Sequence, residues 1–191
     1  MRPFAIASLI ILTASVIHPA FARPVAYLLD PAASTVAFET DFGPDKITGD
    51  MPVDSATLKL DFDTVGNSQI DVRLGAAKAS ASFPFAAQAL KGPKVLDTGT
   101  HPDIHFESTK VRKTKEGAAV DGNLTIRGVT KPVTLAAVLY RQKGTEAGDL
   151  TRLTLRLTGR VNRSDYGATG WADMVGDEVR IIITARISRT E

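Results

Sequence analysis

The chain has 191 residues and a formal net charge of +2, with 23 basic and 21 acidic side chains distributed along its length. Because no basic stripe and no cluster of aromatic side chains is visible, the composition argues against a nucleic-acid partner. The chain contains no cysteine, which excludes disulfides and thiol chemistry.

The first 22 residues have the pattern of a secretory signal peptide. Arg2 supplies a positive charge, residues 4–17 form an apolar run, and Ala20-Phe21-Ala22 is a cleavage site of the A-x-A type. The apolar run is shorter than the about 20 residues that cross a membrane as a helix. We therefore expect an exported protein whose mature part, residues 23–191, is one domain, with an uncleaved anchor as the alternative.

Period-two alternation of apolar and polar residues predicts strands along most of the mature chain. In chain order the predicted strands cover residues 27–29, 35–42, 57–63, 69–74, 104–107, 124–127, 133–140, 153–161 and 179–187. Nearly all of the links between them, such as Lys115-Glu116-Gly117, are too short for parallel crossovers, so the sheet is predicted to be antiparallel. A sheet of eight or nine strands with one apolar face must close or pack on another sheet.

One segment has helical signals. Ser82 is a candidate N-cap, Pro84 follows early, and Gly92 is a stop, so a helix of about two turns is expected near residues 83–91 as a plug or lid for one barrel end. The expected fold class is all-β, an antiparallel barrel with eight strands or nearly so. A barrel of this size is either filled by its side chains or holds one small ligand, and the spacing of residues does not choose between these.

The last long stretch of alternation, LTLRLTGRVNRSDYG (residues 153–167), continues onto two charged residues. Arg163 and Asp165 fall on the apolar face of the strand pattern. Two interpretations remain: Arg163 pairs with Asp165 at a corner of the barrel, or the two contact the polar end of a ligand at the rim. In both, the charge marks the point where the strand leaves the apolar interior.

Other polar residues do not form a convincing catalytic or metal-binding set. His101 and His105 are predicted to face solvent, since no second cluster supplies further ligands. Asp61 and Asp63 are predicted to lie on a solvated strand face. Ser164 lacks the strand-turn-helix context of a hydrolase nucleophile. We therefore expect no enzyme activity, no catalytic residue, no metal and no cofactor.

Several segments, in order, resemble the YceI family of exported bacterial proteins. They are YLLDP (27–31) with STVAF (34–38), LD (96–97) with HPDIHFEST (101–109), GNLTIRGVTKPV (122–133), NRSDYG (162–167) and VGDEV (175–179). The resemblance implies a lipocalin-like barrel with an apolar tunnel for a polyisoprenoid tail, such as that of a quinone, and a periplasmic location. The chain departs from the family at Ala33, where many members have a histidine.

The resemblance and the strand pattern together predict a non-catalytic protein that transports, stores or protects a polyisoprenoid-type lipid. Alternatives are a fatty acid or fatty amide ligand, or a filled-core stress-response or interaction protein without a small ligand. A membrane redox partner is possible, and the protein is expected to be a monomer or homodimer. Predicted tail contacts are Phe38, Phe42, Phe62, Ile70, Val72, Phe106, Leu124, Ile126, Leu155, Leu157, Val161, Ile181 and Ile183, with Arg163 and Asp165 at the rim.

Overall fold

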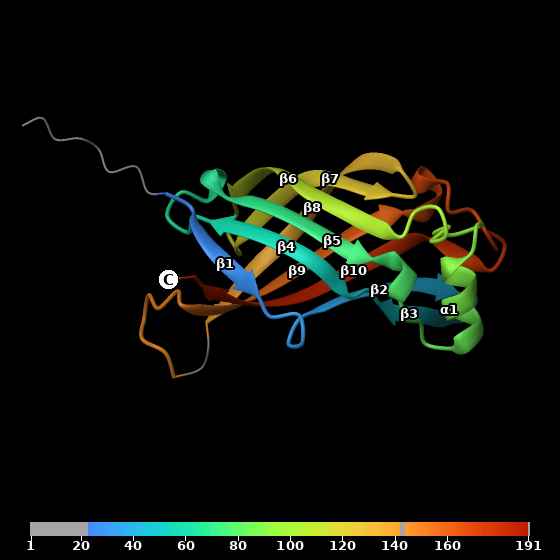
Figure 1. The fold of residues 1–191 in the computed structure, drawn as a ribbon, viewed down its shortest axis with the longest axis horizontal. Helices are drawn as coiled ribbons and strands as arrows, with labels where there is room; N and C mark the ends of the chain where they lie inside the picture. Colours follow the sequence, from blue (N-terminus) through green and yellow to red (C-terminus); the bar gives the residue numbers. More distant parts are fainter. Residues whose placement is uncertain (1–22, 142–143, 191) are drawn as a thin grey trace, which may run out of the picture.

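The computed structural model describes residues 23–141 and 144–190, so the predicted signal peptide lies outside the described residues. The strands in this part of the chain are β1 (Val25–Leu29), β2 (Thr35–Phe42), β3 (Asp45–Asp50), β4 (Val53–Leu60), β5 (Gln69–Gly75), β6 (Asp103–Lys113), β7 (Ala118–Ile126), β8 (Val129–Arg141), β9 (Arg152–Asn162) and β10 (Val175–Arg189) (Figure 1). The α-helix is α1 (Pro84–Lys91), and 3-10 turns lie at η1 (Val65–Asn67), η2 (Ala76–Lys78) and η3 (Arg163–Tyr166). None of the described helices is long and apolar enough to span a membrane.

The strands form a closed antiparallel barrel with eight positions around its wall. The order is β1-β4-β5-β6-β7-β8-β9-β10, and pairing of β10 with β1 closes the ring. β10 pairs with β2 along its first part and with β1 near its end, so β1 and β2 share one position. β3 and β4 share the next position, because β3 pairs with β2 and β4 pairs with β1. The predicted all-β fold with an eight-stranded barrel is confirmed.

Alternation along each strand decides which side chains face the interior. In β9, Leu155 and Leu157 point into the barrel, whereas Arg156 and Thr158 are exposed on its outer surface. The pairing register carries this alternation from strand to strand, since Leu157 lies opposite Ile183 of β10. One apolar face therefore becomes the continuous inner surface of the wall.

One strand was missed by the sequence pattern. β3 contains Lys46, Thr48 and Asp50, with Ile47 as its only large apolar side chain, so its own residues give a weak signal. It forms because all six of its residues pair with β2, from Asp45 opposite Phe42 to Asp50 opposite Ala37. Pairing with β2 thus stabilises a strand that the local sequence pattern does not predict.

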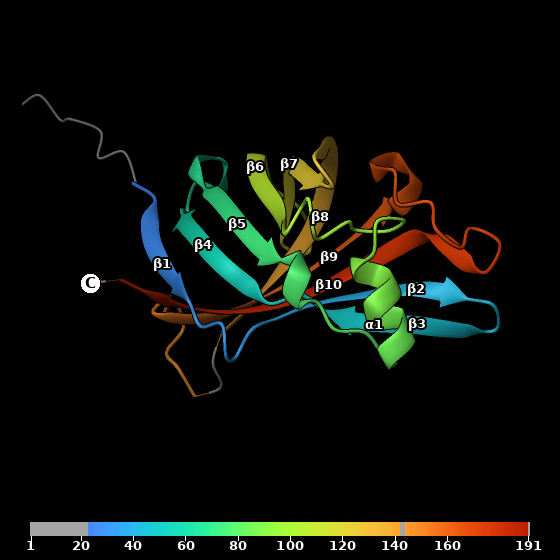
Figure 2. The same ribbon diagram turned by 45° about the vertical axis from the view of Figure 1, so that its right-hand side comes forward.

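The helix α1 lies at one end of the barrel, beside β2 and β3 (Figure 2). Pro84 is its first residue, a position where the missing N–H of proline costs nothing. The N-cap is Phe83, so the predicted cap at Ser82 is wrong. Ser82 instead donates its backbone N–H to the carbonyl of Thr48 at 2.7 Å, which fastens the segment before the helix to β3. Gly92 follows the last helical residue, as predicted.

Asp61 is buried in a turn, which corrects the prediction that it lies on a solvated strand face. β4 ends at Leu60, and the Asp61 carboxylate accepts hydrogen bonds from the backbone N–H groups of Asp63 (3.1 Å) and Thr64 (2.7 Å) and from Nδ2 of Asn67 (2.9 Å). These bonds, with that from Thr64 first, hold the pKa of Asp61 below its ordinary value. The carboxylate therefore orders the connection from β4 to β5.

We expect the free energy of unfolding to fall when the pH is lowered below about 4. Hydrogen bonds from Arg112 and Thr134 lower the pKa of Asp121 from 3.8 to about 2, and the pKa of Asp61 is also lowered. A carboxyl group whose pKa is lower in the folded state stabilises the fold above its unfolded pKa. That contribution is lost as the pH falls through the folded value.

Urea unfolding at a series of pH values measures this effect. Asp121→Asn is expected to flatten the dependence between about pH 4 and pH 2, because the titrating group is gone. Asp63→Asn is the control, since the Asp63 side chain is exposed and the turn hydrogen bonds described above are accepted by Asp61 instead. An Asp121→Asn protein whose acid dependence equals that of the unchanged protein would contradict the prediction.

Candidate functional site

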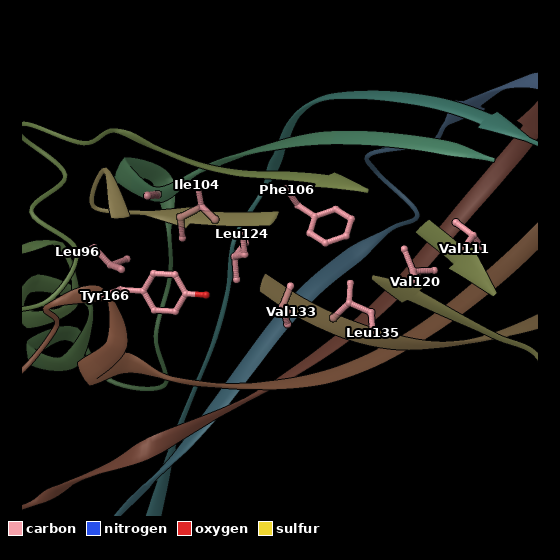
Figure 3. Packing of buried hydrophobic residues seen from close by; sticks show 10 residues of the cluster. Leu96, Ile104, Phe106, Val111, Val120, Leu124, Val133, Leu135 and Tyr166 are labelled. Carbon is pink, nitrogen blue, oxygen red and sulfur yellow. The ribbon is translucent and has the colours of Figure 1, made fainter. Parts of the chain in front are cut away.

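The interior of the barrel is hollow. It contains a cavity of about 840 Å³, which lies within the range of about 300–1,000 Å³ for pockets that hold small molecules. All ten described strands contribute lining side chains, and most of these are aliphatic or aromatic. Figure 3 shows part of this apolar inner surface, with side chains from β6, β7 and β8 beside Leu96 and Tyr166. The structure therefore decides against a filled core.

The middle of the wall has inward-facing side chains that are only partly buried. Val72, Leu157 and Ile183 belong to the inner face, yet each retains accessible surface. That surface borders the cavity, because the outer face at these positions is occupied by their polar neighbours in the alternation. An apolar ligand in the cavity would cover it.

Two glycines allow large rings to lie flat against the wall. A Cβ atom at Gly122 would overlap the Phe106 ring, and a Cβ atom at Gly49 would overlap the ring of Phe38. Phe38 and Gly49 are direct cross-strand partners in β2 and β3. Because the partner strand offers no side chain at these points, the rings rest on backbone and leave the centre of the barrel open.

The two ends of the barrel differ. At the end near β1, neighbouring strands of the wall contribute a buried cluster, which we call the closing cluster and which contains Tyr27, Leu58, Leu60, Leu153, Ala185 and Ile187. Leu58, Leu60 and Ala185 also border the cavity. The Tyr27 and Phe62 rings meet edge to face there, with centroids 5.8 Å apart. Phe62 is not among the residues that line the cavity, in contrast to its predicted role as a tail contact. It packs on this closing cluster because β4 ends at Leu60 and the chain turns.

The cavity reaches the surface at the end where α1 lies. Phe83 and Phe85 at the start of α1, with Trp171 and Met174 in the connection from β9 to β10, line the cavity and are also exposed. Phe85 is 83% exposed. Large apolar side chains gathered at an opening are typical of a binding surface rather than of a solvated rim. We define these four residues as the mouth.

The other predicted wall residues lie together around the cavity. Twelve of the thirteen predicted tail contacts line it: Phe38, Phe42, Ile70, Val72, Phe106, Leu124, Ile126, Leu155, Leu157, Val161, Ile181 and Ile183. Their contact with a ligand stays a prediction. Lining residues that the sequence reasoning missed include Val120 and Leu135, which a longer reading of the alternation in β7 and β8 would have found.

Arg163 lies at the corner where β9 passes into η3, and it is only 9% exposed. Its guanidinium donates four hydrogen bonds to backbone carbonyls: Nε to Gly176 (3.0 Å), Nη1 to Ala168 (2.6 Å) and Gly170 (2.8 Å), and Nη2 to Val175 (2.9 Å). All four acceptors lie between residues 168 and 176. The guanidinium therefore holds the connection into β10 against the end of β9.

The predicted pairing of Arg163 with Asp165 is wrong. Asp165 is exposed and borders the outer surface of β8, β9 and β10 instead of the cavity. The reason is that η3 bends the chain, so alternation ends at Asn162 and the two side chains diverge. Asp177 takes the expected structural role, since its carboxylate accepts from the backbone N–H (2.9 Å) and the hydroxyl (2.7 Å) of Ser164. Arg163 lines the cavity, and its contact with a ligand stays a prediction.

Tyr166, the last residue of η3, is a polar lining residue that the sequence reasoning missed. It is 2% exposed and packs in one cluster with Leu96, Ile104, Leu124 and Val133. In Figure 3 its hydroxyl is directed toward Leu124 and Val133, which both line the cavity. Burial, followed by the charge of Asp165, raises the pKa of the phenol, so the hydroxyl stays protonated at neutral pH.

The histidines lie apart from the cavity lining. His105 faces outward from β6, and its Nε2 lies 2.9 Å from Oδ2 of Asp71 on the neighbouring strand. Because it is half-buried in this pair, it is less solvated than predicted. Across residues 23–141 and 144–190, no three His, Asp or Glu side chains are grouped so that they could hold a metal ion.

The closed wall, the hollow apolar interior and the single described helix at the mouth define a lipocalin-like barrel, a class whose interior can hold one small molecule. The pattern of the YceI-like domain matches residues 27–187. The chain therefore belongs to the YceI-like family.

Curated relatives match over part of their length. A UPF0312 protein of Serratia proteamaculans is 33% identical over 116 residues, which span 61% of this chain and 60% of the relative. A UPF0312 protein of Yersinia pestis is 36% identical over 95 residues, which span 50% of this chain and 49% of the relative. The chain thus matches between about half and three-fifths of the length of these relatives.

Solved structures share the barrel at low sequence identity. BcnA of Burkholderia cenocepacia superposes with a TM-score of 0.70 at 20% identity, covering 83% of this chain and 98% of that one. The YceI protein of Campylobacter jejuni gives 0.61 at 16% identity, covering 100% and 99%. A polyisoprenoid binding domain from Saccharophagus degradans gives 0.58 at 12% identity, covering 87% and 99%. These similarities support the fold.

Proposed function

We propose that the protein is a non-catalytic periplasmic binding protein that holds a polyisoprenoid-type lipid, such as an isoprenoid quinone, in the barrel cavity. The observation that carries the proposal is the apolar cavity of about 840 Å³ with an apolar mouth. The similar domain from Saccharophagus degradans is described as polyisoprenoid binding. The signal-peptide pattern of residues 1–22 supports export to the periplasm. The bound lipid would be transported, stored or protected from water.

Burial of apolar surface is sufficient to drive such binding. An isoprenoid tail that loses on the order of 500 Å² of accessible surface gains roughly 12 kcal/mol at about 25 cal/mol per Å². Ordering the tail and losing rigid-body freedom subtract a large part of this gain. A net dissociation constant between nanomolar and micromolar is expected, and no catalytic group takes part.

A fatty acid or fatty amide is the alternative ligand, because the aliphatic wall accepts an unbranched tail as well. The bulky rings of Phe38 and Phe106 and the many branched side chains of the wall leave an irregular surface, which methyl-branched isoprene units fill better than a straight chain. Delivery to a membrane redox partner, and function as a monomer or homodimer, are further parts of the proposal.

Solvent extraction and mass spectrometry of the protein purified from its own periplasm test the proposal. We expect a co-purifying lipid with a polyisoprenoid tail in near-stoichiometric amount. Leu157→Trp should remove it, because the indole would fill the middle of the cavity. A fatty acid in its place would support the alternative.

The matched control is Thr158→Trp, which places the same side chain on the exposed outer face one residue further along β9. This variant should retain the lipid, since strands accept aromatic residues well. Protein that is consistently free of lipid, or equal lipid loss in both tryptophan variants, would contradict binding in the cavity.

A further inference from the structure

The three tyrosines of the chain differ in how their hydroxyl groups are used. Tyr27 is buried in the closing cluster, and its hydroxyl donates to the carbonyl of Leu150 at 2.8 Å. Tyr140 is 50% exposed on β8, where its hydroxyl reaches solvent. Tyr166 as a residue is 2% exposed, and its hydroxyl makes no hydrogen bond to the other described residues. The hydroxyl oxygen is not among the fully buried polar atoms, so it keeps a small accessible surface, and the residue lines the cavity. Hydroxyl groups in apolar surroundings are normally hydrogen-bonded, so a free hydroxyl on the cavity wall points to a partner that enters the cavity.

The other polar side chains on the cavity wall are already engaged or lie at its opening. The Thr40 hydroxyl lies 3.0 Å from the carbonyl oxygens of Gly176 and Glu178. The Ser34 hydroxyl accepts the backbone N–H of Arg186 at 2.9 Å. Arg163 uses four of the five N–H groups of a guanidinium on backbone carbonyls.

Gln88 and Lys94 also line the cavity, but both are exposed to solvent. Lys94 lies over the ring of Trp171, at 5.8 Å from its centroid. Within the described part of the chain, the Tyr166 hydroxyl is therefore the side-chain group of the wall, away from the mouth, whose hydrogen-bonding capacity is unused.

We propose that Tyr166 is the ligand-anchoring residue of the cavity and that its hydroxyl donates a hydrogen bond to a carbonyl oxygen at the end of the apolar tail. This inference rests on the proposed function and specifies the polar chemistry of the ligand. An acceptor is favoured over a donor because the positively charged Arg163 lines the cavity from the same turn. A neutral carbonyl is favoured over a carboxylate because burying an anion costs far more.

The position of Tyr166 also sets the orientation of the ligand. Tyr166 packs with Leu96, which belongs to the loop after α1, so the anchor lies toward the mouth. The tail would extend past Leu124 and Val133 toward the closing cluster. The carbonyl end would remain near the mouth, where the ligand enters and leaves.

Binding of two probes to the full-length mature protein tests the inference. The probes are geranylgeranylacetone, which has a ketone at the end of an isoprenoid tail, and the hydrocarbon in which a methylene replaces the carbonyl. Trp171 is the single tryptophan of the chain and lies at the mouth, so its fluorescence reports occupancy. The unchanged protein should bind the ketone about 3- to 10-fold more tightly than the hydrocarbon.

Tyr166→Phe should abolish this preference by weakening the ketone alone, and it should leave the urea midpoint unchanged or higher, since no intramolecular bond is lost. Tyr140→Phe, the same change outside the cavity, should keep the preference. Equal preference in the unchanged and Tyr166→Phe proteins, with both probes bound, would overturn the anchor while leaving lipid binding intact. A lower urea midpoint in Tyr166→Phe would instead assign the hydroxyl a structural role. Failure of both probes to bind the unchanged protein would overturn the proposed function and the anchor together.

Discussion

Replacing Arg163 by methionine is expected to destabilise the fold by about 3–5 kcal/mol. The guanidinium donates to four backbone carbonyls between residues 168 and 176, and methionine would leave these acceptors without their donor. Each buried acceptor that loses its partner costs about 1–3 kcal/mol, although such costs do not add fully. Urea unfolding followed by far-UV circular dichroism measures the change.

The control for this prediction lies three residues earlier. Arg160 is exposed on the outer face of β9 and pairs with Glu178 at 3.3 Å, an interaction that contributes little at the surface. Arg160→Met should therefore change the stability by less than about 0.5 kcal/mol. Similar changes in stability for the two substitutions would show that the hydrogen bonds from Arg163 to the four backbone carbonyls do not hold the corner of the barrel.

Truncation of two isoleucines in β10 is expected to change the stability by different amounts, because one lies in the closing cluster and the other borders the cavity. Ile187 is 3% exposed in the closing cluster, so Ile187→Ala should cost about 2–5 kcal/mol through lost burial and a new cavity. Ile183 lies on the same strand and the same face but borders the existing cavity. Ile183→Ala should cost less than about 2 kcal/mol, because part of its surface is already uncovered.

Lipid-free protein must be used for the stability measurement, since a bound ligand would add its own stabilisation to the folded state. Lipid retention, measured on the lipid-loaded protein, should show the opposite order of effects from stability. Ile183→Ala should alter lipid retention, and Ile187→Ala should not. Equal destabilisation of about 3 kcal/mol or more by both substitutions in lipid-free protein would indicate a filled interior and contradict the hollow barrel.

The binding proposal links these effects to the function. Buried contacts in the closing cluster and hydrogen bonds of Arg163 stabilise the two ends, while the middle of the wall remains uncovered and apolar. Because the stabilising contacts are concentrated at the ends, the interior can stay open for a ligand. The exposed aromatic side chains of the mouth complete the path between solvent and cavity.

Strand alternation made most of the wall predictable. Leu155, Leu157, Ile181 and Ile183 were assigned to one face because a period of two is a local property of the chain. The helix was recognisable for a similar reason, since Pro84 and Gly92 act within a few residues of their position. Its cap was misplaced, because the backbone of Ser82 pairs with Thr48 of β3, a contact that no local pattern reveals.

Contacts between distant segments explain the other differences. Asp61 continues an alternating pattern, yet three hydrogen-bond donors from the following turn draw it into a buried position. Asp165 was placed beside Arg163 because both fall on one face of an extended strand, and η3 ends that extension. Tyr166 belongs to the NRSDYG segment of the family resemblance, but a single tyrosine in a turn has no period, so no pattern placed its side chain on the cavity wall.

The sequence by itself determined an antiparallel sheet, its apolar face, the approximate strand and helix positions and the membership in a family, because these depend on local periodicity and on short motifs. Only the tertiary structure decided that the barrel is hollow, that backbone carbonyls surround Arg163 and that Tyr166 lines the cavity with a hydroxyl that no protein group pairs. The physical reason is that an empty volume and an unused hydrogen bond depend on how side chains from opposite walls meet, and that distance is set by closure of the barrel.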